Sequence, residues 1–177
     1  MRILLINPSY PFEEFPRLLV TLPYLASALR AEGHEVEILD LLLARTTPDK
    51  IERRMQRFRP ELVGITSVTL NHHIANSIGE VVRKCDGNVR IAMGGPHVSF
   101  EIEGSFRDLP ALDYIGIGEG EHTMIELARS LREHVRKEGL QAVGHTEEID
   151  LRDPVEVVVR QGGQALDGGR SGVGEEQ

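Results

Sequence analysis

Short apolar runs that end at glycine, proline or a polar residue recur along the first two thirds of this 177-residue chain. Most of them show no alternation of apolar and polar residues, which is typical of parallel strands whose two faces are both covered. The second run does alternate, so it is predicted to be an outer strand that is partly exposed on one face. The predicted strands are residues 2–6, 35–39, 62–66, 89–93 and 113–117.

The segments between these runs have apolar residues three or four positions apart, which is the spacing of an amphipathic helix. Thr21 is a candidate cap for the first helix, and Gly33 is placed to end that helix in the left-handed conformation. Thr47-Pro48 opens the second helix, and Asn71 is a candidate cap for the third. The residues predicted to face the core are Leu18, Leu22, Leu25, Leu29, Ile51, Met55, Phe58, Ile74, Ile78, Val81 or Val82, Cys85, Met124, Ala128, Leu131 and Val135.

Two further helices, a short weak one over 100–109 and a long one over 121–137, continue the alternation of strands and helices. Repeated strand–helix–strand units are right-handed crossovers, and they produce a parallel sheet. The predicted fold class is therefore α/β. We expect a flavodoxin-like, doubly wound, five-stranded parallel sheet of order 2-1-3-4-5, with helices on both faces.

The character of the chain changes after residue 138, which predicts a domain over 1–138 and an acidic, glycine-rich extension over 139–177. More than half of the net charge of −8 lies in this extension. Residues 155–160 are a candidate strand that could pair with a neighbour across Gly162 and Gly163. The glycine, serine and glutamate content toward the end of the extension predicts partial disorder.

The net negative charge and the amino-acid composition disfavour several classes of binding partner. A net charge of −8 disfavours nucleic acid and anionic membranes, because both require a basic surface. Aromatic residues make up 5% of the chain and tryptophan is absent, which disfavours stacking on bases. No apolar run approaches a membrane span, and the first one stops too early for a signal peptide, so a cytoplasmic protein is expected. The single cysteine, Cys85, excludes an internal disulfide and a cysteine-rich metal or iron–sulfur site.

Ligands of open α/β sheets bind outside the carboxyl ends of the strands, near the point where the strand order reverses. In the predicted order, four loops that carry glycine or a hydroxyl group end at this edge. Together they would form a broad ledge of backbone N–H groups and hydroxyls, which suits a large, flat or elongated ligand. The candidate binding residues are Asn7, Pro8, Ser9, Thr66, Ser67, Val68, Thr69, Gly94, Gly95, Pro96, His97, Gly118, Glu119 and Gly120.

Several polar residues near this edge allow two interpretations. His97 is the one histidine placed to meet a ligand, and a hydrogen bond within its loop explains it equally well. His72 and His73 are adjacent at the start of a helix and face different directions, so they are not predicted to form a metal site. Glu119 and Glu121 resemble a catalytic carboxylate pair, but stabilisation of a helix N-terminus is the favoured role. The sequence contains no Ser–His–Asp grouping and no Walker loop, so no catalytic centre is predicted.

Six stretches of the chain, taken in order, resemble the N-terminal cobalamin-binding domain of cobalamin-dependent radical-SAM proteins. They are Ile6-Asn7-Pro8, Leu22-Pro23-Tyr24-Leu25-Ala26 with Leu29, Gly33-His34-Glu35-Val36 with Asp40, Leu62-Val63-Gly64-Ile65-Thr66, Met93-Gly94-Gly95-Pro96-His97 and Gly118-Glu119-Gly120-Glu121-His122-Thr123. The last two stretches, at this interval, are the most specific. The resemblance extends from residue 1 to about residue 135.

This resemblance implies a flavodoxin-like fold that holds cobalamin over the carboxyl edge of the sheet. The nucleotide tail would pass Thr66, Ser67, Gly94 and Gly95, and the corrin would lie over the loops after the first, third and fifth strands. In such enzymes a following domain carries a Cys-x-x-x-Cys-x-x-Cys iron–sulfur motif and S-adenosylmethionine. Because Cys85 alone cannot hold a cluster, we expect this chain to be the cofactor module of a radical-SAM enzyme, possibly a methyltransferase in type, whose catalytic domain acts in cis or in trans.

One departure from related domains concerns the cobalt. Cobalamin domains of the methionine-synthase type place Asp-x-His-x-x-Gly after the first strand, and that histidine binds cobalt. Here the loop is Asn7-Pro8-Ser9-Tyr10-Pro11-Phe12, without histidine. We therefore predict bound cobalamin with its dimethylbenzimidazole off and no protein histidine on cobalt. The alternative is a non-enzymatic flavodoxin-like interaction module that has lost its ligand.

Overall fold

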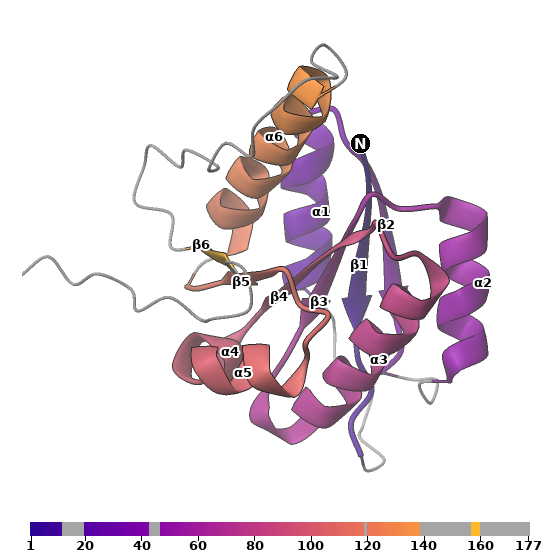
Figure 1. Cartoon of the computed structure of the whole chain (residues 1–177), viewed down its shortest axis with the longest axis vertical. Helices are drawn as coiled ribbons and strands as arrows, with labels where there is room; N and C mark the ends of the chain where they lie inside the picture. The colour runs from indigo at the N-terminus through magenta and orange to yellow at the C-terminus, as the bar shows by residue number, and fades with distance from the viewer. Residues whose placement is uncertain (12–19, 43–46, 119, 139–156, 160–177) are drawn as a thin grey trace, which may run out of the picture.

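The computed structural model describes residues 1–11, 20–42, 47–118, 120–138 and 157–159. Within them one sheet has the strand order β2-β1-β3-β4-β5-β6. The first five strands are parallel, which confirms the predicted order, and helices cover both faces (Figure 1). The strands are β1 (Arg2–Asn7), β2 (Glu35–Asp40), β3 (Leu62–Thr66), β4 (Arg90–Gly94), β5 (Tyr114–Gly116) and β6 (Val157–Val159).

The strand β6 extends the sheet beyond the five predicted parallel strands. It runs antiparallel to β5, with Val158 opposite Ile115. It falls inside the candidate strand over 155–160, where consecutive valines favour the extended conformation. The neighbour that was predicted across Gly162 and Gly163 lies outside the described residues.

Helices connect the parallel strands, and none that the structure describes is long and apolar enough to cross a membrane. The predicted helix over 100–109 has the wrong bounds, because this segment forms two short helices. The first begins at Pro96, whose fixed φ suits the first helical position. Glu101, with φ −128° and ψ 61°, separates the two. The helices are α1 (Thr21–Ala31), α2 (Pro48–Phe58), α3 (His72–Cys85), α4 (Pro96–Phe100), α5 (Ile102–Asp108) and α6 (Gly120–Glu138), with the 3-10 turn η1 (Thr69–Asn71) before α3.

One predicted cap is wrong, one occupies its predicted position, and one helix stop is confirmed. Thr21 is the first residue of α1, and Val20 precedes it as the cap residue without a side-chain cap bond. Asn71 is the N-cap residue of α3, as predicted, but its Oδ1 atom accepts a hydrogen bond from the Val68 N–H at 3.0 Å and makes no cap bond to the helix. Gly33 follows α1 with φ 79°, the left-handed conformation that glycine adopts without strain.

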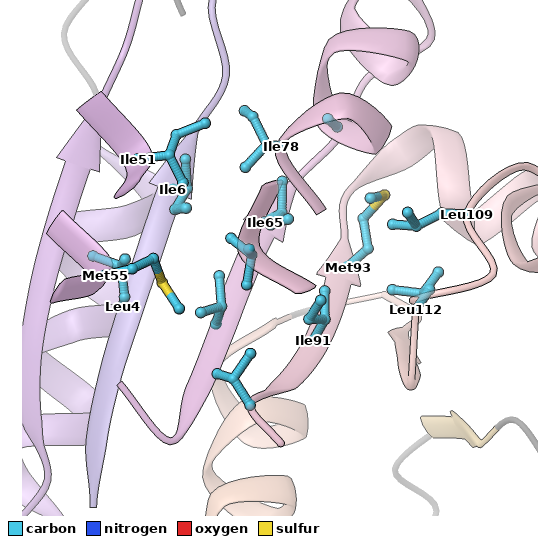
Figure 2. Packing of buried hydrophobic residues seen from close by; sticks show 14 of the residues in the cluster. Leu4, Ile6, Ile51, Met55, Ile65, Ile78, Ile91, Met93, Leu109 and Leu112 are labelled. Atoms are coloured by element: carbon cyan, nitrogen blue, oxygen red, sulfur yellow. The ribbon is translucent and has the colours of Figure 1, made fainter. Parts of the chain in front are cut away.

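Two hydrophobic clusters lie on the two faces of the sheet. Ile3 and Leu5 of β1 pack with residues of α1 and α6, whereas Leu4 and Ile6 pack with residues of α2, α3 and α5. Both faces of β1 are therefore covered, and this explains why its sequence shows no alternation. Figure 2 shows the second cluster. Its labelled members are Leu4, Ile6, Ile51, Met55, Ile65, Ile78, Ile91, Met93, Leu109 and Leu112.

Cys85 was predicted to face the core, and it is exposed. It is the last residue of α3, one helical turn after the buried Val82. The apolar stripe thus continues in the sequence to Cys85, but the helix ends there, and the following turn at Asp86 and Gly87 is exposed as well. Of the other residues predicted to face the core, Leu18 and the side chain of Val135 lie outside the described part of the chain.

Candidate functional site

The four loops that were predicted to share one edge follow the carboxyl ends of β1, β3, β4 and β5. In the sheet, Ile6 is opposite Ile65, Thr66 is opposite Gly94, and Gly94 is opposite Gly116. These registers bring the strand ends into one row, so the loops leave the sheet side by side. We call this surface the ledge. Its described residues are Asn7, Pro8, Ser9, Thr66, Ser67, Val68, Thr69, Gly94, Gly95, Pro96, His97, Gly118 and Gly120, and Glu119 lies outside the described residues.

The loop after β1 is anchored to the neighbouring strand β2. The Asn7 side-chain amide donates a hydrogen bond to the Asp40 carboxylate at 2.9 Å, and the Asn7 carbonyl accepts one from the Leu41 N–H at 2.9 Å. Pro8 and Ser9 are buried. This loop is therefore held in place by β2 at one end of the ledge, and it contains no histidine.

The loops after β3 and β4 are joined through Ser67. The Ser67 N–H donates to the Gly94 carbonyl at 2.8 Å, and the Ser67 carbonyl accepts from the His97 N–H at 3.3 Å. Gly95 lies between these bonds with φ 110° and ψ 175°, a conformation that is essentially limited to glycine. A Cβ atom at Gly95 would lie 2.5 Å from the Ser67 carbonyl oxygen, so this close approach of two backbones requires glycine.

A pair of histidines connects the same two loops through their side chains. The His72 and His97 rings have centroids 3.8 Å apart and are tilted by 39°. Ser67 Oγ lies 3.0 Å from His72 Nδ1, and Thr69 Oγ1 lies 3.2 Å from His97 Nδ1. His97 thus makes a hydrogen bond, as the second interpretation expected, but its partner Thr69 belongs to the loop after β3 and not to its own loop.

The contacts of His72 with Ser67 and His97 are the feature of this region that the sequence did not indicate. Its side chain is buried, and burial is the main cause that lowers its pKa below the ordinary histidine value. The nearby His97 lowers this pKa further, whereas the Asp108 carboxylate opposes the shift. His72 is therefore neutral near pH 7. Its partner His97 is 25 residues away in the chain, so no local pattern could have indicated the pair.

The remaining surface of the ledge is open backbone, which fits a large cofactor with amide and phosphate groups at its periphery. A Cβ atom at Gly118 or Gly120 would meet no atom within 4 Å, and one at Gly94 would meet only the Gly116 carbonyl oxygen at 3.8 Å. A flat ligand can therefore approach these backbone groups directly. The helix α6 begins at Gly120, and the N–H groups of its first turn favour an anion.

The described ledge residues offer hydroxyl, amide and imidazole groups, and no carboxylate is among them. Across the described part of the chain, the His, Cys, Asp and Glu side chains form no group of three that could hold a metal ion. The described groups of the ledge can therefore bind a ligand through neutral hydrogen-bonding groups.

A hollow of about 580 Å³ lies at the opposite edge of the sheet, where the strands begin. Arg2, Arg59, Cys85 and Arg90 are among the residues that line it. Its polar groups are partly used within the protein, since the Arg2 side chain donates to the Arg59 carbonyl at 2.7 Å. We assign the ligand to the carboxyl edge instead, because strand-end loops and helix N-termini present their free donors there.

The comparison with protein families agrees with this geometry. A family model described as the B12 binding domain matches residues 20–128, which is more than half of the chain. The chain belongs to this family. Its cofactor is therefore cobalamin, as predicted, and the matched residues include the loops after β3, β4 and β5.

Relatives of this B12-binding domain include two methyltransferases. The chain is 34% identical over 160 residues to an uncharacterized methyltransferase, PH0819, of Pyrococcus horikoshii, which covers 86% of the chain and 34% of the relative. It is 29% identical over 148 residues to cytidylyl-2-hydroxyethylphosphonate methyltransferase of Streptomyces wedmorensis, with 70% of the chain and 27% of the relative covered. The B12-binding domain thus spans about a third or less of these relatives.

A solved structure of similar sequence supports the same relationship. The cobalamin-dependent S-adenosylmethionine radical enzyme OxsB, with aqua-cobalamin and S-adenosylmethionine bound, superposes with a TM-score of 0.66 at 27% identity. This match covers 75% of the chain and 19% of OxsB. A cobalamin-binding protein from Desulfitobacterium hafniense, with a TM-score of 0.54 at 15% identity, shares the fold.

Proposed function

We propose that this chain is the cobalamin-binding module of a radical-SAM enzyme, of the methyltransferase class. Three observations support the proposal: the family, the methyltransferase relatives that are about three times longer, and the likeness to OxsB. Bound cobalamin would supply the cobalt–carbon chemistry. The chain itself would bind and orient the cofactor, and a catalytic domain in cis or in trans would carry S-adenosylmethionine and an iron–sulfur cluster.

The ledge residues divide the binding task between backbone and side chains. Gly94, Gly118 and Gly120 would accept the flat cofactor against open backbone, and the N-terminus of α6 would stabilise its phosphate. Thr69 would contribute a hydroxyl group at the surface. Ser67 is fully buried, so its role is to join the loops after β3 and β4.

The same proposal includes cobalt without a protein histidine. The observation that carries it is the loop after β1, in which Asn7 is bonded to Asp40 and the buried Pro8 and Ser9 follow. This loop has no imidazole to offer. His97, on the ledge, is bonded to Thr69 instead.

The first test is retention of the cofactor. Aquacobalamin is mixed with the purified chain and the mixture is desalted, and we expect the protein fraction to keep the visible spectrum of the corrin. The variant Gly94→Val adds a side chain to the ledge and should lose most of this colour. Gly87→Val is the matched control, because a Cβ atom there meets open space on an exposed turn. Loss of colour from the wild-type chain would reject the proposal and favour the ligand-free interaction module.

The second test addresses the cobalt ligand. The bound cofactor is reduced to cob(II)alamin and its electron paramagnetic resonance spectrum is recorded. We expect no splitting from an axial nitrogen, because neither the dimethylbenzimidazole nor a histidine is bound. A nitrogen splitting that disappears in His97→Gln would show that a protein histidine does reach cobalt.

A further inference from the structure

His72 lies behind the ledge rather than on it, and it contacts both loops that the ledge needs. Its side chain is 10% exposed. It is bonded to Ser67, which follows β3, and its ring packs against His97, which belongs to α4 after β4. His72 can therefore influence ligand binding through these two loops, without itself touching the open backbone of the ledge.

We propose that His72 is a positioning residue for the cofactor ledge, and that its neutral ring holds the loops after β3 and β4 together. Addition of a proton to this ring separates the two loops and weakens cobalamin binding. This inference rests on the proposed function, because the measured quantity is the affinity of the ledge for cobalamin.

The hydrogen bonds around His72, with the Asn76 amide nitrogen as a donor, are those of a neutral ring. The Asn76 side-chain nitrogen lies 3.1 Å from His72 Nε2, so the amide donates to Nε2 and the ring proton belongs on Nδ1, which donates to Ser67 Oγ. A protonated ring would carry hydrogen on both nitrogens. Its Nε2–H would then face the N–H of Asn76, and a hydrogen bond could form again only if the amide turned over to present its Oδ1 atom, which is buried and has no partner in the described part of the chain.

The charged and titratable groups around His72 come from three elements. His97 on α4 has its ring at 3.8 Å, the Asp108 carboxylate on α5 lies 4.0 Å from His72 Nε2, and His73 is its neighbour on α3. Asp108 favours the protonated ring, but half of its side chain is exposed, so water screens its charge. Burial and His97 favour the neutral ring, and they lower the pKa of His72.

The direction of the pH effect follows from this shift. Because the pKa of His72 is lowered in the folded chain, its neutral ring persists at and above about pH 6.5, the ordinary histidine value. As the pH falls below that value, the proton enters at the lowered pKa and the histidine contact weakens. Cobalamin affinity should therefore be constant above neutrality and should decrease toward acid pH.

The experiment measures the dissociation constant of methylcobalamin by visible absorbance between about pH 5 and about pH 8. If binding needs one neutral group, the constant rises about tenfold per pH unit below the pKa of that group. We expect this rise for the wild-type chain and for His73→Gln, which alters an exposed neighbouring histidine in the same way. In His72→Gln, which removes the ring contact with His97 and cannot titrate, we expect weaker binding than in the wild type at neutral pH and no acid dependence.

Each result separates this inference from the proposed function. Absence of binding at every pH, for the wild type and for His73→Gln, rejects the proposed function. Normal binding with an unchanged acid dependence in His72→Gln overturns the role of His72. If His72→Gln does not fold, nitrogen-15 spectra of the histidine rings in the wild type decide the question. The protonation midpoint of His72 must then coincide with the midpoint of binding, and a mismatch overturns the inference.

Discussion

Substitution of Gly95 by alanine tests the junction between the loops after β3 and β4. Gly95 has φ 110° and ψ 175°, and a Cβ atom there would lie 2.5 Å from the Ser67 carbonyl oxygen and 3.1 Å from its nitrogen. Because the clashing atoms are backbone, no side-chain rotation can relieve the contact. The loop must move, and with it the hydrogen bonds that Ser67 makes to Gly94 and to His97.

The expected loss of stability can be worked from these contacts. Holding alanine in this backbone region costs about 1–3 kcal/mol. Loss of two hydrogen bonds adds about 0.5–1.5 kcal/mol each, so Gly95→Ala should lower the free energy of unfolding by about 2–6 kcal/mol. This is a large part of the ~5–15 kcal/mol that is typical of a folded domain.

Gly33→Ala is the matched control for the backbone conformation alone. Gly33 also has a positive φ, 79°, but a Cβ atom there would meet nothing within 4 Å. Its expected cost is about 1–2 kcal/mol. Urea unfolding followed by circular dichroism gives the midpoint and the slope for both variants, and an unchanged slope shows that only stability has changed. Equal midpoints for Gly95→Ala and Gly33→Ala would refute the assignment of the clash with Ser67.

Three further predictions concern the ledge and its surroundings. Gly94→Ala should change the unfolding free energy by less than about 1 kcal/mol, because its Cβ would make only an ordinary contact with the Gly116 carbonyl oxygen at 3.8 Å. Retention of aquacobalamin after desalting should nevertheless fall, and full retention would contradict the assignment of the cofactor to the ledge. Arg83→Met should lower the free energy of unfolding, measured in urea, by about 2–4 kcal/mol, because the Arg83 guanidinium donates to carbonyls of the α3–β4 turn and to Asp113 at 2.7 Å. Arg83→Lys should recover less than half of this free energy, and full recovery would show that the charge alone matters. Burial lowers the pKa of His34 below 6.5, so the chain should lose stability as the pH falls from 6.5 through the lowered pKa. His34→Gln should reduce this loss of stability at acid pH. Unfolding midpoints of the wild type that do not change with pH would refute the role of His34.

The parallel sheet could be predicted because each strand carries its own local signal. Runs such as RILLI at residues 2–6 are buried on both faces, and glycine or proline ends them, so the strand positions followed from the sequence pattern. The 2-1-3-4-5 order followed from the flavodoxin-like fold that is common for five strands alternating with helices. The predictions failed where a neighbour decided the outcome. The apolar stripe of α3 continues in the sequence to Cys85, but that residue is exposed at the end of the helix. Asn71 takes the predicted cap position of α3, but its side chain accepts the Val68 N–H instead of an N–H of the helix.

The position of the ledge was also determined by the sequence, since parallel strands place all their carboxyl ends at one edge. The contacts within the ledge were decided by the tertiary structure. The contact between His72 and His97, and the approach of Gly95 to Ser67, join residues from separate loops whose distance depends on the register of β3 with β4. Local propensity is encoded within a few residues and can be recognised in a sequence. Contacts between loops arise only when the packed sheet brings them together, and the sequence carries no local pattern for them.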